Sequence, residues 1–338
     1  SYLVVDCGGG TVDLTIRTLL ENKTLDEVTE RSGALCGGAC VDENFIKFLG
    51  KKIGEDTIMK FKQKHYGEYQ YLINNFFCSK IKFCFTGEPS NARKRIILDL
   101  DRECPRLKKY VKDCVRIPIN FDDIVSMFDP VIDQIINLIE KQLANTTKKC
   151  SAMFLVGGFS ESIYLIKRIK DRFRMEVPQI NVPQNPITSV IRGAVMYGLN
   201  KNIIKNRILP MSYGFEVYER TTTRFDKFGC IASRGQRIAL EEKFTKKCIP
   251  VYDDQKAVHF KVFATSKTNP EYCNEDGMKE VGDLHIELPD DNSSSNKSEV
   301  ELSLTFGELL ITATAKNKEN KTLTAKFTYA RPEFVELA

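Results

Sequence analysis

The sequence has 338 residues, 42% of them hydrophobic and 28% charged, which is long enough for about two domains of ordinary globular composition. The net charge of +5 is a small difference between 50 basic and 45 acidic residues, so we predict no nucleic-acid partner. No apolar stretch has the length of a membrane span, so we predict no membrane partner. Eleven cysteines without a C-x-x-C pair favour free thiols in a reducing compartment, and we expect a cytoplasmic protein.

The first predicted element is a β-hairpin. Tyr2 to Val5 form a β-prone apolar run, three glycines interrupt it, and residues 11–18 resume an alternating pattern. Because the sequence opens inside the apolar run rather than before it, we expect an N-terminal truncation.

A mostly helical block is predicted next. The pair Gly37-Gly38 is followed by helical signals from residue 42 to 85, and short strands are expected near 96–100 and 109–117. We interpret residues 37–118 as an inserted subdomain.

The following segment has the order of an α/β fold. Asn120 is a candidate N-cap for a long amphipathic helix that contains Pro130, where we expect a kink. A strand at 152–156, two glycines and a helix from Ile163 come next, and another helix is expected over 189–199. We therefore predict an α/β lobe over residues 1–205.

From residue 206 onward the pattern changes to short β-prone runs, which predicts an all-β module over 206–338. The runs are 214–218, 258–264, 284–288, 300–305, 309–315 and 323–329. The polar segment 290–297 between two of them has the composition of a mobile loop.

The first candidate site is the turn of the hairpin, which contains Gly8, Gly9 and Gly10. Without β-carbons, the backbone N–H groups of such a turn can close on phosphate oxygens, and Thr11 adds a hydroxyl donor. Asp6 would lie beside bound phosphates, where a carboxylate is useful if it holds a divalent cation, directly or through water. Asp13 could do the same or cap a turn. A glycine-rich hairpin with two exposed aspartates is an equally weighted alternative.

The second candidate site is the strand end at Val156, which is followed by Gly157 and Gly158. Two glycines let a flat ligand such as a purine lie against the backbone, and Ser160 or Ser162 would cap the next helix. Taken alone, this turn is better explained by packing.

Taken together, the order and spacing of these motifs resemble the second half of the actin, sugar-kinase and heat shock protein 70 superfamily over residues 2–205. The stretches LVGGFSES (155–162) and RGAVMYGL (192–199) are most similar to heat shock protein 70, in particular to its divergent member-twelve branch. The resemblance implies an actin-like (ribonuclease-H-like) ATPase lobe that uses ATP or ADP with Mg²⁺.

The resemblance also implies which residues form the site. Asp6 corresponds to the carboxylate near magnesium and the attacking water, so the catalytic roles fall on Asp6, Thr11 and Asp13. The implied nucleotide contacts are Gly8, Gly9, Gly10, Gly38, Lys82, Thr86, Gly157 and Gly158.

Three departures from the family pattern affect this expectation. Ala39 and Cys40 replace acidic residues at the entry to the inserted block, and Glu161 replaces the arginine that usually stacks on the base. Ile187 stands where the family has an aspartate. These changes bear on adenosine affinity and on hydrolysis.

The resemblance implies a chaperone-like function, in which nucleotide binding gates the binding of unfolded or extended peptide segments by the β module. A plain stabilising β domain is an equal alternative for that module. The family's first phosphate loop lies in the first lobe, so we expect ATP hydrolysis at most in a full-length parent. Two other readings stay open: a degenerate, non-hydrolysing scaffold, and a sugar or metabolite kinase, against which the β-rich region after Ile208 argues.

Overall fold

The computed structural model describes residues 1–88, 96–111, 115–219, 223–252, 255–288, 299–307 and 309–330, so the predicted mobile loop at 290–297 lies outside the described residues. The chain divides into two compact units. The first contains residues 1–17 and 32–200, and the second contains 18–31 and 201–330 of the described chain.

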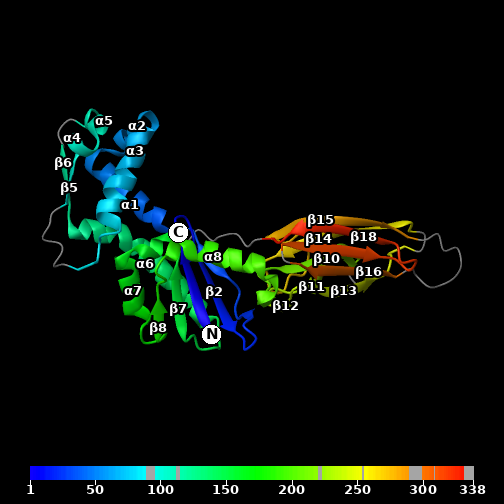
Figure 1. Ribbon diagram of the computed structural model, residues 1–338. Coiled ribbons are helices and arrows are strands. Elements are labelled where there is room, and N and C mark those ends of the chain that lie inside the picture. The colour runs from blue at the N-terminus through cyan, green and yellow to red at the C-terminus, as the bar shows by residue number, and fades with distance from the viewer. Residues whose placement is uncertain are drawn as a thin grey trace. The chain divides into compact units, whose positions relative to one another are not determined.

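The first unit contains a β-sheet with mixed strand directions (Figure 1). Its strands are β1 (Tyr2–Cys7), β2 (Val12–Leu19, continuing past residue 17), β4 (Ser32–Ala34), β7 (Ala152–Val156) and β8 (Gln179–Asn181). β1 and β2 form the predicted antiparallel hairpin, whereas β1 is parallel to β7 and β7 is parallel to β8. Alternate residues of β1 are buried, because one face of the sheet is covered more completely than the other.

Helices of the first unit pack beside this sheet. They are α6 (Phe121–Ala144), η3 (Gly158–Glu161), α7 (Ile163–Phe173) and α8 (Pro186–Leu199). The predicted cap of α6 is confirmed, since the Asn120 N–H donates to Asp123 Oδ2 at 2.8 Å in a capping box. α6 continues through Pro130 for 24 residues, because its wide apolar stripe is buried along the whole helix.

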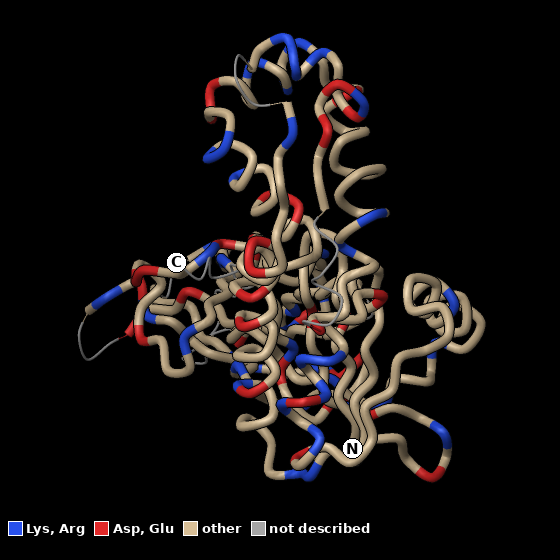
Figure 2. The backbone as a smooth tube through the Cα atoms, turned by 90° about the vertical axis from the view of Figure 1, so that its left-hand side faces the viewer, with Lys and Arg blue, Asp and Glu red and all other residues tan. Residues whose placement is uncertain are grey.

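Residues 38–119 form a block with its own apolar contacts. Its elements are α1 (Gly38–Ile53), α2 (Glu55–Lys64), α3 (Tyr66–Tyr71), the π-helix η1 (Leu72–Lys82), β5 (Ile96–Asp99), α4 (Leu100–Glu103), α5 (Pro105–Lys108) and β6 (Arg116–Ile119). Phe45 of α1 stacks on Phe77 of η1 with ring centroids 4.2 Å apart, and both rings are fully buried. Figure 2 shows that Lys and Arg are frequent at the end of the block formed by α2–α5.

The second unit contains mainly strands. They are β3 (Leu25–Glu27), β9 (Ile204–Ile208), β10 (Ser212–Glu219), β11 (Arg224–Ala232), β12 (Arg237–Ala239), β13 (Glu242–Cys248), β14 (Ala257–Thr265), β15 (Met278–Glu287), β16 (Val300–Phe306), β17 (Leu310–Lys316) and β18 (Thr322–Thr328), preceded by the short helix η4 (Lys201–Ile203). Two four-stranded sheets, β11-β10-β14-β15 and β13-β16-β17-β18, share one core that includes Tyr213, Phe215 and Phe306.

The segment 18–31 lies with the second unit, although it follows β2 directly in sequence. Two buried carboxylates hold it there. Asp26, 2% exposed, accepts a hydrogen bond from Asn206 Nδ2 at 3.0 Å and pairs with Arg237. Glu27, 3% exposed, accepts from the Ile208 N–H at 2.9 Å. These contacts join residues about 180 positions apart, which explains why the sequence pattern assigned the segment to the first lobe.

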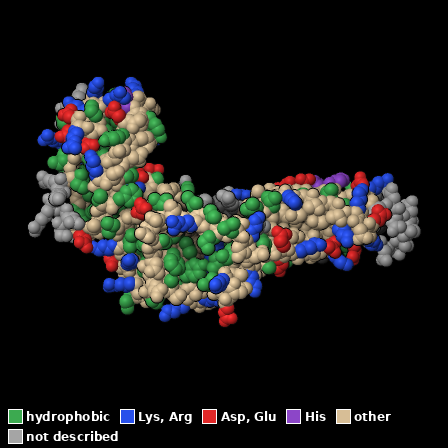
Figure 3. Space-filling view, in the orientation of Figure 1, with side chains coloured by type: hydrophobic (Ala, Val, Ile, Leu, Met, Phe, Trp, Pro, Cys, Tyr) green, Lys and Arg blue, Asp and Glu red, His purple; other side chains and the backbone are tan. Residues whose placement is uncertain are grey.

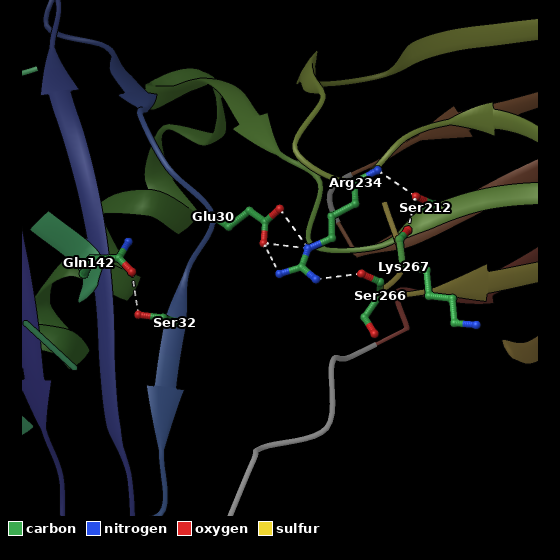
Figure 4. A network of polar contacts seen from close by, with 7 residues as sticks. All are labelled: Glu30, Ser32, Gln142, Ser212, Arg234, Ser266 and Lys267. Atoms are coloured by element: carbon green, nitrogen blue, oxygen red, sulfur yellow. Dashed lines mark hydrogen bonds and ion pairs between the residues drawn. The ribbon is translucent and has the colours of Figure 1, made fainter. Parts of the chain in front are cut away.

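A second polar network involves the same segment (Figure 4). Arg234 Nε lies 3.0 Å from each carboxylate oxygen of Glu30, and Arg234 Nη1 donates to the Ser266 carbonyl at 2.6 Å. The Arg234 N–H donates to Ser212 Oγ at 2.9 Å, and this hydroxyl donates to the Lys267 carbonyl at 3.0 Å. One guanidinium thus connects segment 18–31 to two loops of the second unit.

Arg234→Ala should lower the free energy of unfolding by about 1–2 kcal/mol, because it removes the bidentate, charge-assisted hydrogen bonds between the Arg234 guanidinium and the Glu30 carboxylate. The measurement is urea unfolding followed by circular dichroism. Lys247→Ala is the matched control, since Lys247 and Glu299 are 69% and 53% exposed and their removal should cost less than about 0.5 kcal/mol. Equal losses in the two variants would contradict the structural importance of the network.

Helix α8 presents an apolar face that nothing in the described chain covers. Six of its large apolar residues are at least half exposed: Ile187, Val190, Ile191, Val195, Met196 and Leu199. Figure 3 shows hydrophobic side chains gathered over this helix. A contiguous apolar patch on a soluble domain usually marks a contact surface. In the described residues, no helix is long and apolar enough to cross a membrane.

Candidate functional site

The two glycine turns singled out in the sequence lie at the same edge of the first unit's sheet. β1 and β7 run parallel with Asp6 opposite Val156, so the turns that follow these strands leave from adjacent carboxyl ends. Gly157 has φ of +84°, and a β-carbon there would lie 2.4 Å from Asp6 Oδ1 and 2.4 Å from the Cys7 carbonyl oxygen. The carboxyl ends of neighbouring parallel strands are where α/β folds generally bind ligands.

The hairpin turn is held from one side by the start of α1. The Gly8 N–H donates to the Thr11 carbonyl at 2.9 Å and closes the turn. The N–H groups of Gly37, Gly38 and Ala39 then donate to the carbonyls of Gly10, Gly8 and Gly9 at 3.1, 3.0 and 2.7 Å. The carbonyl oxygens of the turn are therefore occupied by the N-terminus of α1, which fixes the turn.

The other side of the turn is open. Gly9 and Gly10 are exposed, and a β-carbon on either would have no atom within 4 Å. Among the described residues, no protein group accepts a hydrogen bond from the Gly9 or Gly10 N–H. Two adjacent N–H donors with free space above them fit a phosphate oxygen.

Asp6 and Asp13 face each other across the hairpin as a cross-strand pair. Thr11 Oγ1 donates to Asp13 Oδ2 at 3.0 Å. Burial, and next the negative charge of Asp13, raise the pKa of Asp6 above its ordinary value. A divalent cation would relieve this repulsion, with water and phosphate oxygens as its remaining ligands. Within the described ranges, no cluster of three or more His, Cys, Asp or Glu side chains suits a metal ion.

Gly38 and Lys82 lie together, beside the residue that follows the second turn. Lys82 Nζ donates to the Gly38 carbonyl at 2.6 Å and pairs with Asp42 Oδ1 at 2.7 Å, and the Lys82 side chain is only 4% exposed. A β-carbon on Gly38 would lie 3.2 Å from the Phe159 ring, and Lys82 Nζ lies 5.5 Å from the centroid of that ring. Lys82 thus connects η1 to α1 across the Phe159 side chain.

The second turn contacts the start of α8. The Gly157 N–H donates to the Pro186 carbonyl at 3.0 Å, and a β-carbon on Gly158 would lie 3.6 Å from Ile187 Cγ1. Ser160 Oγ donates to the Val156 carbonyl at 2.7 Å. Ser162 Oγ accepts from the Leu165 N–H at 3.3 Å, which confirms that Ser162 caps the next helix.

The structure places Thr86 in the lining of a small cavity that also contains Phe85, Phe121 and Ile124. Next to it, Gly87 has φ of +72°, and a β-carbon there would lie 2.2 Å from the Tyr164 ring, so this segment packs against the first turn of α7. Thr86 therefore lies at the junction of the inserted block with α6 and α7.

Two residues of this site were missed by the sequence reasoning. Asp42 pairs with Lys82 over 40 positions, and the Phe159 ring lies against Gly38 and near Lys82 Nζ. The only signal available was the position of Phe159 directly after the glycine pair, and no local pattern relates residue 42 to residue 82.

Comparison with known proteins supports the family resemblance. The chain is 28% identical over 360 residues to the human protein named heat shock 70 kDa protein 12A and 25% identical over 357 residues to human heat shock 70 kDa protein 12B, in each case with 93% of this chain aligned. The chaperone protein DnaK of Thermoplasma volcanium is 22% identical over 63% of the chain. No family model matches the sequence.

These matches confirm the resemblance to the heat shock 70 superfamily and to its divergent member-twelve branch. At the family level the chain is heat-shock-70-like, and its mixed helices and sheets fit an actin-like fold. The chain spans about half the length of the curated relatives it matches, 51% for protein 12A and 52% for protein 12B.

Gly157→Ala and Gly9→Ala form a matched pair for the geometry of the two turns. Gly157→Ala should destabilise the protein by about 2–4 kcal/mol, because it forces a side chain into left-handed backbone and into Asp6. Gly9→Ala should change the stability by less than about 0.5 kcal/mol, because its β-carbon enters open space. Thermal and urea unfolding would measure both, and similar losses would show that the two turns are not arranged as described.

Asp6→Asn should stabilise the protein near neutral pH. A carboxyl group whose pKa is raised by folding disfavours the folded state once it is ionised, and this effect is absent below the ordinary pKa of 3.8, where the group is protonated in both states. The difference in unfolding midpoint between Asp6→Asn and the unchanged protein should therefore shrink as the pH falls through the raised pKa of Asp6. A difference that stays constant from about pH 7 to about pH 3.5 would contradict the burial and repulsion assigned to Asp6.

Proposed function

We propose that this protein binds ATP or ADP with Mg²⁺ at the edge formed by β1 and β7, and that it acts as a heat-shock-70-like, chaperone-like protein. The single observation that carries the proposal is the close approach of Gly157 to the end of β1 just before the hairpin turn, with Asp6 Oδ1 2.4 Å from the β-carbon position of Gly157. The glycine hairpin, proposed here to bind phosphate, and the second glycine turn would thereby lie close enough to bind the two ends of one nucleotide.

The chain's own residues would divide the work at the phosphate end. The N–H groups of Gly9 and Gly10 would donate to phosphate oxygens, and Thr11 Oγ1, now on Asp13, is within reach of the same turn. Asp6 would hold Mg²⁺, directly or through water, and the bound ion would supply charge neutralisation to the phosphates. The hydrogen bonds from α1 to the turn carbonyls keep the N–H groups aimed outward.

The proposed mechanism is conformational gating rather than rapid turnover. Phosphoryl transfer depends on positioning and charge stabilisation from both sides of a closed cleft. Ala39, Cys40 and Ile187 differ from the family pattern. We therefore propose nucleotide binding, and not hydrolysis, as the activity of this site.

The second unit would bind extended peptide segments by strand addition. Its two sheets end in four edge strands, and the edge strand β18 has mainly exposed side chains, including Leu323 at 40% exposure. An exposed edge offers backbone donors and acceptors to an added strand. A domain that only stabilises the protein is the competing proposal, and it predicts no peptide affinity.

Two alternatives concern the whole protein. A non-hydrolysing interaction scaffold is favoured by the replacement of polar family residues with Ile187 and by the exposed apolar face of α8. Measurable ATP turnover by the full-length protein would exclude it. A sugar or metabolite kinase of the same superfamily is disfavoured by the β-rich residues after 208, since such a kinase would normally finish with helices.

Gly9→Val should weaken binding of Mg-ATP at least about tenfold, because its branched side chain occupies the open space above the hairpin where a phosphate would lie. Isothermal titration calorimetry of the full protein measures this. Gly67→Val is the matched control, because Gly67 also has open space around its β-carbon but lies in α3 of the inserted block. If Gly9→Val binds Mg-ATP as tightly as Gly67→Val does, the hairpin is not the phosphate site.

A further inference from the structure

We infer that the nucleotide site of this protein recognises the phosphate chain and not the base, so that its ligand class is nucleoside triphosphates in general rather than ATP alone. The inference rests on the proposed nucleotide binding and specifies its ligand. It comes from a contrast between the two turns in the described chain. The N–H groups of Gly9 and Gly10 in the hairpin turn have no protein acceptor, whereas the hydroxyls of Ser160 and Ser162 after the second turn are bonded inside the protein.

Discrimination between bases requires hydrogen-bonding groups aimed at the base edge, because the faces of all bases stack on apolar surfaces with similar energies. The polar side chains that surround Gly157 and Gly158 are bonded inside the protein. Ser160 and Ser162 are both 0% exposed, and their hydroxyls bond to the Val156 carbonyl and the Leu165 N–H. Neither hydroxyl is available to a ligand on that side.

Lys82, which the family resemblance places beside the adenosine, also has its polar group bonded inside the protein. Lys82 Nζ bonds to the Gly38 carbonyl at 2.6 Å and to Asp42 Oδ1 at 2.7 Å, and it lies between the rings of Phe83 and Phe159 at 5.8 and 5.5 Å from their centroids. Lys82 is only 4% exposed and its ammonium has two oxygen partners, so releasing it is costly because Asp42 would lose its charge partner. Lys82 therefore acts as a positioning residue that connects α1 and η1.

The start of α8 contributes an apolar side chain, and its hydroxyl groups are already hydrogen-bonded within the protein. Ile187 lies over Gly158, and the hydroxyls of Thr188 and Ser189 both donate to the Asn185 carbonyl, at 3.2 and 3.1 Å. Glu161 replaces the arginine of the family pattern and is exposed. Ile187 thus offers a base an aliphatic surface, which supports stacking without selecting among bases.

Competition binding with the full protein tests the inference. A fluorescent Mg-ATP analogue would be displaced with ATP, GTP, UTP and inorganic tripolyphosphate, each with Mg²⁺. We expect ATP, GTP and UTP to have dissociation constants within about threefold of one another, and tripolyphosphate to compete within about tenfold of ATP. An ATP preference of about tenfold or more over GTP and UTP would overturn the inference while leaving nucleotide binding intact.

Two further outcomes are decisive. Failure of tripolyphosphate to compete, with ATP still bound, would also overturn the inference, because the phosphate chain would then be insufficient. Failure of every ligand to bind would refute the proposed nucleotide function, and the inference with it. The titration with ATP alone distinguishes these cases. ATP still binds when the protein prefers ATP to GTP and UTP or when tripolyphosphate fails to compete, whereas it does not bind when the nucleotide function itself is refuted.

Two variants separate positioning from base recognition. Lys82→Met should lower the thermal midpoint by about 3–5 °C, because it leaves Asp42 unpaired, but it should leave the ratio of ATP to GTP affinity unchanged. Thr86→Val should leave the same ratio unchanged. A shift of the ratio by about tenfold in either variant would identify that residue as a base reader and contradict the inference.

Discussion

The in-register parallel pairing of β1 with β7 is the constraint on which the candidate site depends. It places Asp6 opposite Val156, so the chain leaves both strands at the same level and the two glycine turns meet. The approach is so close that position 157 cannot carry a β-carbon without striking Asp6 and the Cys7 carbonyl, and its φ of +84° also favours glycine. One residue therefore satisfies a backbone requirement and a packing requirement together.

The same contact gives the site two chemically different halves. On the hairpin side, α1 takes up the carbonyl oxygens of the turn and leaves the N–H groups of Gly9 and Gly10 free in the described chain. On the other side, Lys82, Ser160 and Ser162 direct their polar atoms into the protein. A ligand would meet donors suited to anions at one end and an apolar wall at the other.

The chain path links the hairpin to the second unit. β2, which carries Asp13, continues into segment 18–31, and the buried carboxylates Asp26 and Glu27 hold that segment to the strands around β9 and β12. Breaking such contacts by removing one partner is costly, because the remaining carboxylate stays buried. Segment 18–31 of the second unit is therefore covalently continuous with the hairpin through β2.

Local sequence determined much of the secondary structure and both glycine turns. The hairpin, the capped helix beginning after Asn120, the strand at 152–156 and most strands of the second unit follow from periodicity, caps and turn residues, which act over a few positions. Seven strands were not among the predicted runs: β3, β4, β8, β9, β11, β12 and β13. Most of them are short, and β9 and β13 pair with strands distant in the sequence, which no local pattern specifies. Only the tertiary structure decided that segment 18–31 lies with the second unit, that Asp42 engages Lys82, and that Asp6 touches Gly157. Each of these depends on residues brought together from distant parts of the chain, and no local pattern encodes that proximity.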